Sequence, residues 1–219
     1  MVNIESFKDI HKGERCFIIG TGPSINNTNL DSLQDEICFG VNTLYRGYDN
    51  LKLRCQYYAV SDPWVWQNHW QGISKLDTQL FIWKSIISMH TPICPYTALN
   101  TAPIPMWMSN RMSEDAAYNV GWGETVIIDV ALQIAYYMGF SKVYLLGCDS
   151  TYEGKHRFDS DGSDVPTSNA IKGNWSHIFK SYQICKEAYE TDGREIINCT
   201  VGGKLEIYKR QKLEDVLNE

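Results

Sequence analysis

The chain has 219 residues, of which 43% are hydrophobic and 12% aromatic, and its formal net charge is −6. This length suits one α/β domain, and the apolar content is sufficient for a core and too high for a disordered chain. The negative charge excludes a dedicated nucleic-acid binder, which would cluster Lys and Arg against phosphates, but it leaves room for a small anion held by backbone amides.

The first part of the chain alternates short apolar runs with turn residues. Buried strands are predicted over Arg15–Gly20, Glu36–Val41, Gln56–Val60 and Gln79–Trp83. Ser24 is the predicted N-cap of a short helix through Leu33, and a Trp-rich helix is predicted after Pro63. From residue 85 to 121 the pattern weakens and prolines accumulate, which favours an irregular insertion acting as a lid.

Regular patterning returns after the insertion. Apolar residues recur at helical spacing from Val126 to Met138, and Gly139 is a natural stop for that helix. The remaining predictions are a strand over Lys142–Gly147, a polar active-site loop over 150–174, a helix over Ser176–Thr191 and a strand over Glu195–Cys199. This order predicts an α/β fold with a mostly parallel, Rossmann-like sheet, helices on both faces, and a single nucleotide-binding domain over residues 1–219.

The cysteines and the start of the chain indicate a compartment. Seven cysteines lie mostly within apolar runs, without any C-x-x-C, so we expect buried thiols rather than disulfides or a zinc site. The N-terminal stretch lacks the apolar core of a signal peptide, and no window has the roughly 18 apolar residues of a membrane span. We expect a cytoplasmic protein without an integral membrane segment; a peripheral position at the inner face of the membrane and a homo-oligomeric state stay open.

Polar or glycine residues follow four of the predicted strands. These residues are Gly20-Thr21-Gly22, Asn42, Asp62 and Asp149. In an open parallel sheet the carboxyl ends of the strands form the ligand-binding edge, so the four endings together predict a site, although each alone is also typical of a turn or helix cap.

The sequence GTGPS after the first strand lacks the third glycine of a dinucleotide fingerprint. Gly20 and Gly22 permit a tight turn, Pro23 suits the first turn of a helix, and amides near Ser24 are predicted to face a phosphate. No acidic residue stands at the ribose position about 20 residues further on, so a mononucleotide is favoured over NAD.

Other polar and aromatic residues have both structural and functional interpretations. His156 and His177 lie in or beside the loop after Asp149 and are candidate proton acceptors, although a loop histidine is more often solvated. The acidic run over 159–164 misses the calcium-loop spacing and is interpreted as solvated. Trp107 and Trp122 are weak stacking candidates. We expect no metal site.

Five segments together resemble the MptE-like proteins, many of which belong to surface-polysaccharide pathways and some of which are 6-hydroxymethyl-dihydropterin diphosphokinases. The segments are CFIIGTGPSI, CFGVNTLY, YYAVSDP, TVIIDVALQIAYYMGFSKVYLLGCDSTY and REIINCTVGGKLEIYKR. The same order is similar to small bacterial sialyltransferases that use CMP-sialic acid. The resemblance extends from Arg15 to Arg210, without the insertion.

The sialyltransferase resemblance implies roles for particular residues. It places the turn around Thr21 and Gly22, together with Asn42, against the nucleotide. From the strand endings, we expect Asp62 and Asp149, with Ser150, to belong to the same nucleotide site. It implies that His177, within a Ser-His pair, is the general base. Phosphate-stabilising positions would be Thr151, Tyr152 and His156, although the two tyrosines of those enzymes are not kept in place, and Thr21 replaces their asparagine.

The implied function is glycosyl transfer from a nucleotide-sugar donor, with a CMP-sugar such as CMP-sialic acid favoured, to a surface-glycan acceptor. The reaction would be metal-independent, with His177 taking the proton of the acceptor hydroxyl. The alternatives are an ATP- and Mg²⁺-dependent pterin-type diphosphokinase, in which Asp62 and Asp149 would bind the metal, and a nucleotide-binding module without catalysis.

Overall fold

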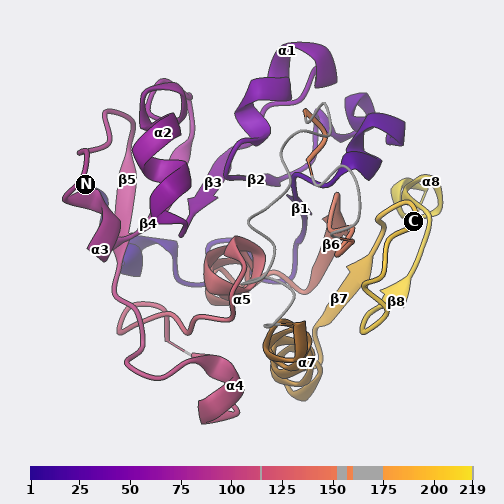
Figure 1. Cartoon of the computed structure of the whole chain (residues 1–219). Helices are drawn as coiled ribbons and strands as arrows, with labels where there is room; N and C mark the ends of the chain where they lie inside the picture. The colour runs from indigo at the N-terminus through magenta and orange to yellow at the C-terminus, as the bar shows by residue number, and fades with distance from the viewer. Residues whose placement is uncertain (114, 152–156, 160–174, 219) are drawn as a thin grey trace.

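A parallel sheet of eight strands runs through the molecule (Figure 1). The computed structural model describes residues 1–113, 115–151, 157–159 and 175–218. The strands are β1 (Arg15–Ile19), β2 (Cys38–Val41), β3 (Tyr57–Val60), β4 (Gln79–Trp83), β5 (Tyr96–Leu99), β6 (Lys142–Leu146), β7 (Glu195–Asn198) and β8 (Lys209–Arg210). Every pairing between neighbouring strands is parallel, which confirms the predicted α/β fold.

Helices cover both faces of this sheet (Figure 1). The α-helices are α1 (Tyr48–Leu51), α2 (Pro63–Ile73), α3 (Lys84–Ile87), α4 (Met106–Ser109), α5 (Gln133–Tyr137), α7 (Trp175–Thr191) and α8 (Leu213–Leu217). Short 3-10 turns are η1 (Ile4–Phe7), η2 (Pro23–Asn27), η3 (Leu30–Leu33) and η4 (Leu44–Gly47), and η5 (Ile127–Leu132) is a π-helix. Residues of η5, α5 and α7 share one core, and residues of η2, η3 and α2 share the other.

The sequence of β1 explains this two-sided burial. Cys16 and Ile18 pack in the core that contains α5 and α7, whereas Phe17 and Ile19 pack in the core on the opposite face. All four side chains are fully buried. Since successive side chains of a strand alternate between faces, a strand covered on both sides must be apolar throughout.

The strand order is β5-β4-β3-β2-β1-β6-β7-β8. From β1 the chain proceeds through β2 to β5 in one direction, and β6 then pairs with the other side of β1, so that β7 and β8 extend the sheet the opposite way. The connections that follow β1 and β6 therefore diverge. Such a switch point leaves a crevice at the carboxyl ends of the strands, which is where ligands bind in sheets of this type.

The stretch 85–121 is not irregular throughout, which corrects the prediction. Residues 96–99 form the edge strand β5, which pairs with β4. Along the chain, the short helix α3 precedes this strand and the short helix α4 follows it. Nearby prolines and the short length concealed this strand. The two-residue strand β8 was also missed.

The segment after β1 differs from the predicted helix over 24–33. It forms the separate turns η2 and η3, and Gly22, rather than Ser24, occupies the N-cap position.

A π-helix occupies the first part of the helix that was predicted over 126–138. In η5 the backbone hydrogen bonds reach to the fifth residue instead of the fourth, which makes the turn wider than that of an α-helix. The side chain of Gln133 supports this segment, because its amide nitrogen donates to the carbonyls of Ile128 and Gly121, at 2.7 Å each. The wider turn places Asp129 toward the sheet edge described below.

All seven cysteines are buried thiols, as predicted. Within the described ranges, no helix has both the length and the apolar character needed to cross a bilayer.

Candidate active site

A pocket of about 950 Å³ lies at the carboxyl ends of the central strands. Its walls come from the segments after β1, β2, β3 and β6, from η5 and from α7. The predicted residues Gly20, Thr21, Gly22, Asn42, Asp62, Asp149, Ser150 and Thr151 all line it. The four strand endings therefore meet at one site, and its volume is in the range of ordinary ligand pockets.

The two glycines of the GTGPS turn are required by the neighbouring strand. A Cβ on Gly22 would lie 1.9 Å from Asp149 Oδ2, and one on Gly20 would lie 2.4 Å from the carbonyl oxygen of Gly147. The Gly22 amide donates to that carbonyl at 2.9 Å. These glycines let the β1 and β6 loops pack closely, and this packing forms the base of the crevice.

Asp149 holds the turn in place. Its Oδ1 accepts from the Ser24 amide at 3.1 Å, and its Oδ2 accepts from the Ser24 hydroxyl at 2.7 Å. Pro23 and Ser24 are not among the lining residues of the pocket. The prediction that the Ser24 amide faces a phosphate is therefore wrong, because the carboxylate of the neighbouring loop already occupies that donor.

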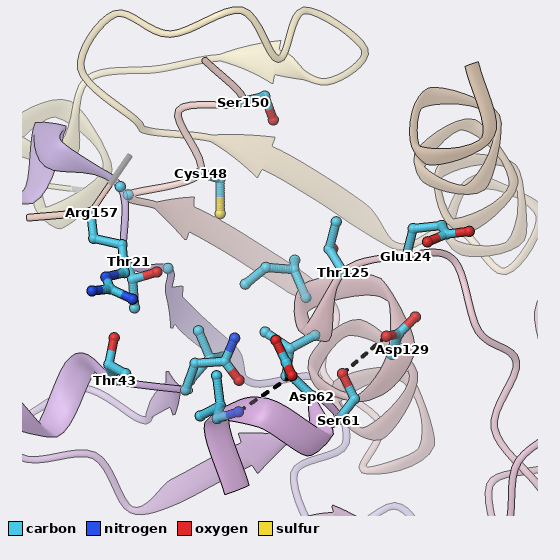
Figure 2. Close-up of a pocket in the computed structure, with 18 of the residues that line it drawn as sticks. Thr21, Thr43, Ser61, Asp62, Glu124, Thr125, Asp129, Cys148, Ser150 and Arg157 are labelled. Atoms are coloured by element: carbon cyan, nitrogen blue, oxygen red, sulfur yellow. Dashed lines mark hydrogen bonds between the residues drawn. The ribbon is translucent and has the colours of Figure 1, made fainter. Parts of the chain in front are cut away.

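The segment after β2 places two unpaired polar atoms in the pocket wall. Asn42 Oδ1 and Thr43 Oγ1 are buried and have no hydrogen-bond partner. Thr43 is 1% exposed, and both residues line the pocket. Figure 2 shows Thr43 among the lining residues. Because buried polar atoms are normally hydrogen-bonded, unpaired ones at a cavity indicate contacts that a ligand completes. The signal in the sequence was the strand end at Asn42; Thr43 was missed.

Asp62 has a structural role at the start of α2. Its Oδ1 accepts from the amides of Trp64 and Val65, at 2.7 and 3.3 Å, as the N-cap of the helix. This is the ordinary role of Asp in front of a helix. Asp62 also lines the pocket, so it adds negative charge to that wall.

Asp129 is a pocket residue that the sequence reasoning missed. The residue is 4% exposed, and its carboxylate accepts from the Gly123 amide at 2.6 Å. It also accepts from the Ser61 hydroxyl at 3.0 Å (Figure 2). Burial raises the pKa of Asp129 to about 7, since the two hydrogen bonds only partly offset the cost of desolvation. A carboxylate within the apolar run Val126–Met138 was the available signal.

Residues from the loop after β6 complete the pocket. Ser150 and Thr151 line it, and so does Arg157, which was not predicted. The Phe158 amide donates to the Thr21 carbonyl at 2.9 Å, so this part of the loop is attached to the GTGPS turn. Tyr152 and His156 lie outside the described residues.

The acidic run over 159–164, which was interpreted as solvated, lies only partly within the described residues. Asp159 forms ion pairs with Arg46 and Arg157, whereas Asp161 and Asp164 lie outside the described residues.

His177 is not among the lining residues of this pocket. Its ring stacks on Trp107 of α4, with ring centroids 4.6 Å apart and planes 3° from parallel, and its Nδ1 is buried without a partner. Trp107 contacts Trp122 edge-on at 5.0 Å, and Trp122 lines the pocket. The insertion thus connects His177 to the pocket through two aromatic rings, and its role as general base stays a prediction.

Charge is distributed unevenly along the pocket. Thr21 and the cationic Arg157 lie toward one end, and Asp129 and Glu124 lie toward the other (Figure 2). Arg157 is also paired with Asp159, so an anion bound at the first end would share the guanidinium with that carboxylate, whereas hydroxyl or amino groups are favoured at the second end.

The carboxylates proposed as magnesium ligands do not fit that role well. Both oxygens of Asp149 accept hydrogen bonds from Ser24, and one oxygen of Asp62 caps α2. A magnesium ion bound through either residue would compete with these bonds. Over the described ranges, no group of three or more His, Cys, Asp or Glu side chains is placed to hold a metal ion.

Comparison with known proteins gives a structural relative. No family model matches the sequence, and neither does any curated protein. Among solved structures, the fold is similar to that of the MAf glycosyltransferase from Magnetospirillum magneticum AMB-1, with a TM-score of 0.58 and 13% sequence identity. The likeness covers 95% of this chain and 37% of the larger protein, so the chain spans little more than a third of its relative's length. At this identity the likeness concerns the fold.

Proposed function

We propose that this protein is a glycosyltransferase that binds a nucleotide-sugar donor in the pocket and transfers the sugar to a glycan acceptor. The observation that carries the proposal is the pocket at the switch point, with its unpaired Asn42 and Thr43 atoms and its single described cation, Arg157. The fold shared with a glycosyltransferase supports the same class of reaction.

The charge distribution supports one orientation of the donor. The phosphate binds near Thr21 and Arg157, where the guanidinium and the Thr43 hydroxyl can pair with its oxygens. The glycosyl group then extends toward the end of the pocket at Ser61 and Glu124, where polar side chains face its hydroxyls. A CMP-sugar such as CMP-sialic acid is the donor that the resemblance in sequence favours.

The reaction is a direct displacement. A base takes the proton of the acceptor hydroxyl, and the acceptor oxygen attacks the anomeric carbon of the sugar. The bond from that carbon to the phosphate oxygen breaks, and its electron pair remains on the phosphate, where Arg157 stabilises the charge. We propose His177 as this base; its ring would have to leave Trp107 to reach the pocket. The reaction is proposed to be metal-independent.

A thermal-shift screen with CMP, CDP, UDP, GDP and ATP, with and without Mg²⁺, tests the proposal. Ligands that bind the native state raise its stability by mass action. We expect CMP to give the largest shift without metal, and Thr43→Val to reduce that shift. A dominant shift with ATP and Mg²⁺ would favour the diphosphokinase instead, and the absence of any shift would contradict a nucleotide site.

A further inference from the structure

Ser61 and Asp129 form a buried pair whose purpose the displacement reaction does not explain. Ser61 follows β3, Asp129 belongs to η5, and both are 4% exposed while lining the pocket. The hydroxyl of Ser61 lies 3.0 Å from Asp129 Oδ2, and the amide of Gly123 occupies Oδ1. The carboxylate of Asp129 is therefore held by a hydrogen bond at each oxygen. Its protonation state determines whether the Ser61 hydroxyl donates or accepts in the hydrogen bond between them.

The ionisation of Asp129 sets the direction of that hydrogen bond. An ionised carboxylate only accepts, so Ser61 must donate its one proton to Asp129 and presents lone pairs to the pocket. A protonated Asp129 donates from Oδ2 instead, and the Ser61 proton becomes available to the pocket. The same serine is an acceptor toward a ligand in the first state and a donor in the second.

A second acceptor on the same pocket indicates which state is used. Asn42 lines the pocket and its Oδ1 is buried without a partner, so a ligand that donates a hydrogen bond to this oxygen would satisfy it. With Asp129 ionised, Ser61 Oγ and Asn42 Oδ1 both present lone pairs to a bound group. Such a surface suits O–H or N–H donors.

We propose that Asp129 is a positioning residue that keeps Ser61 as a hydrogen-bond acceptor, so that Ser61 and Asn42 together bind O–H or N–H donors of the ligand. The inference rests on the proposed function and deepens it, since the donors would be hydroxyls of the transferred sugar or the amino group of the nucleobase. A ligand that offered only acceptors here would be rejected.

The surroundings of Asp129 make this selection dependent on pH. The charged and titratable groups near it are Glu124, which precedes η5, Asp62 beside Ser61, and Cys185 of α7. Burial raises the pKa of Asp129 to about 7, and the charge of Glu124 contributes in the same direction. If binding requires the ionised form, affinity falls about tenfold between pH 8 and pH 6, in proportion to the ionised fraction.

Isothermal titration with CMP and with CMP-sialic acid between pH 6 and pH 8 tests the proposal. Asp129→Asn keeps an acceptor for the Gly123 amide but directs an N–H donor at Ser61, so it mimics the protonated state. We expect it to bind about tenfold more weakly than wild type at pH 8, as for one lost hydrogen bond, and without the pH dependence. Ser61→Ala should also lose the pH dependence, and the exposed Asp35→Asn should keep the wild-type profile.

The two ligands identify the source of the donors. A pH dependence with CMP that Ser61→Ala abolishes assigns the donors to the nucleotide, and one confined to CMP-sialic acid assigns them to the sugar. Protonation of the CMP phosphate changes the affinity of all variants equally. Its contribution to the pH dependence therefore cancels when the variants are compared.

Several results would overturn the inference. Wild-type affinity for Asp129→Asn at pH 8, or a pH dependence unchanged in Ser61→Ala, would refute it while leaving the proposed function intact. Ser61→Ala decides alone if Asp129→Asn does not fold. Failure of wild type to bind either ligand would refute the CMP-donor assignment and this inference together.

Discussion

The buried carboxylate of Asp129 predicts a specific dependence of stability on pH. Burial raises its pKa in the folded protein from 3.8 to about 7. Between these values the folded state retains a proton that the unfolded state releases, so stability due to this group is present at low pH and is lost as pH rises through 7. A shift of about 3 units corresponds to an upper limit of about 4 kcal/mol, at 1.36 kcal/mol per unit.

Asp129→Asn removes this titration and retains the shape of the side chain. We expect the difference in unfolding free energy between the variant and wild type to be smallest toward pH 4, where both side chains are neutral in the folded state. As pH rises, the unfolding free energy of the variant should increase relative to that of wild type, by up to about 4 kcal/mol. This difference in unfolding free energy should level off above pH 7.

Urea unfolding followed by tryptophan fluorescence from pH 4.5 to pH 8 measures this difference, with Asp35→Asn as the matched change at an exposed carboxylate. A difference between Asp129→Asn and wild type that stays constant across this range would refute the reasoning.

Three further predictions concern the turn, the pocket wall and the histidine. Gly22→Ala places a methyl group 1.9 Å from Asp149 Oδ2 and should lower the unfolding free energy by about 2–4 kcal/mol in chemical denaturation; an unchanged midpoint would contradict the close packing. Thr43→Val removes a buried hydroxyl that has no partner, so it should leave the melting temperature equal or higher and yet weaken CMP binding about tenfold; a large loss of stability would mean that the hydroxyl has a structural partner. His177→Ala should reduce the rate of transfer about hundredfold with little change in CMP affinity, and an undiminished rate would exclude it as the base.

The apolar runs of the sequence were sufficient to predict the centre of the fold. Strands such as Cys16–Ile19 are buried on both faces, so every residue in them is apolar. A continuous apolar run in the sequence therefore marks a buried strand. The edge strands β5 and β8 were missed because β5 buries only alternate residues and lies among prolines, and β8 has only two residues, so neither forms a continuous apolar run. The π-helix could not be distinguished from an α-helix in the sequence, because its apolar residues keep a spacing that is also typical of an α-helix.

The site was predictable where strands end and unpredictable where contacts join distant segments. Asn42 and Asp149 stood out because they follow apolar runs. That Asp149 would hold Ser24 depends on how the β1 and β6 loops meet. Asp129 was overlooked since a single acidic residue in an amphipathic helix is ordinarily solvated, and only the packing against Ser61 reveals its burial.

The release of CMP from CMP-sugars, including CMP-sialic acid, tests the central claim most directly. Purified protein would be incubated with the donor and a panel of glycan acceptors in the presence of a chelator, and free CMP and extended glycan would be quantified by mass spectrometry. The proposed glycosyl transfer predicts that CMP and extended glycan appear in equal amounts, and that Thr43→Val reduces both. Tight binding of the donor in this pocket, with the donor left intact beside every acceptor, would contradict it.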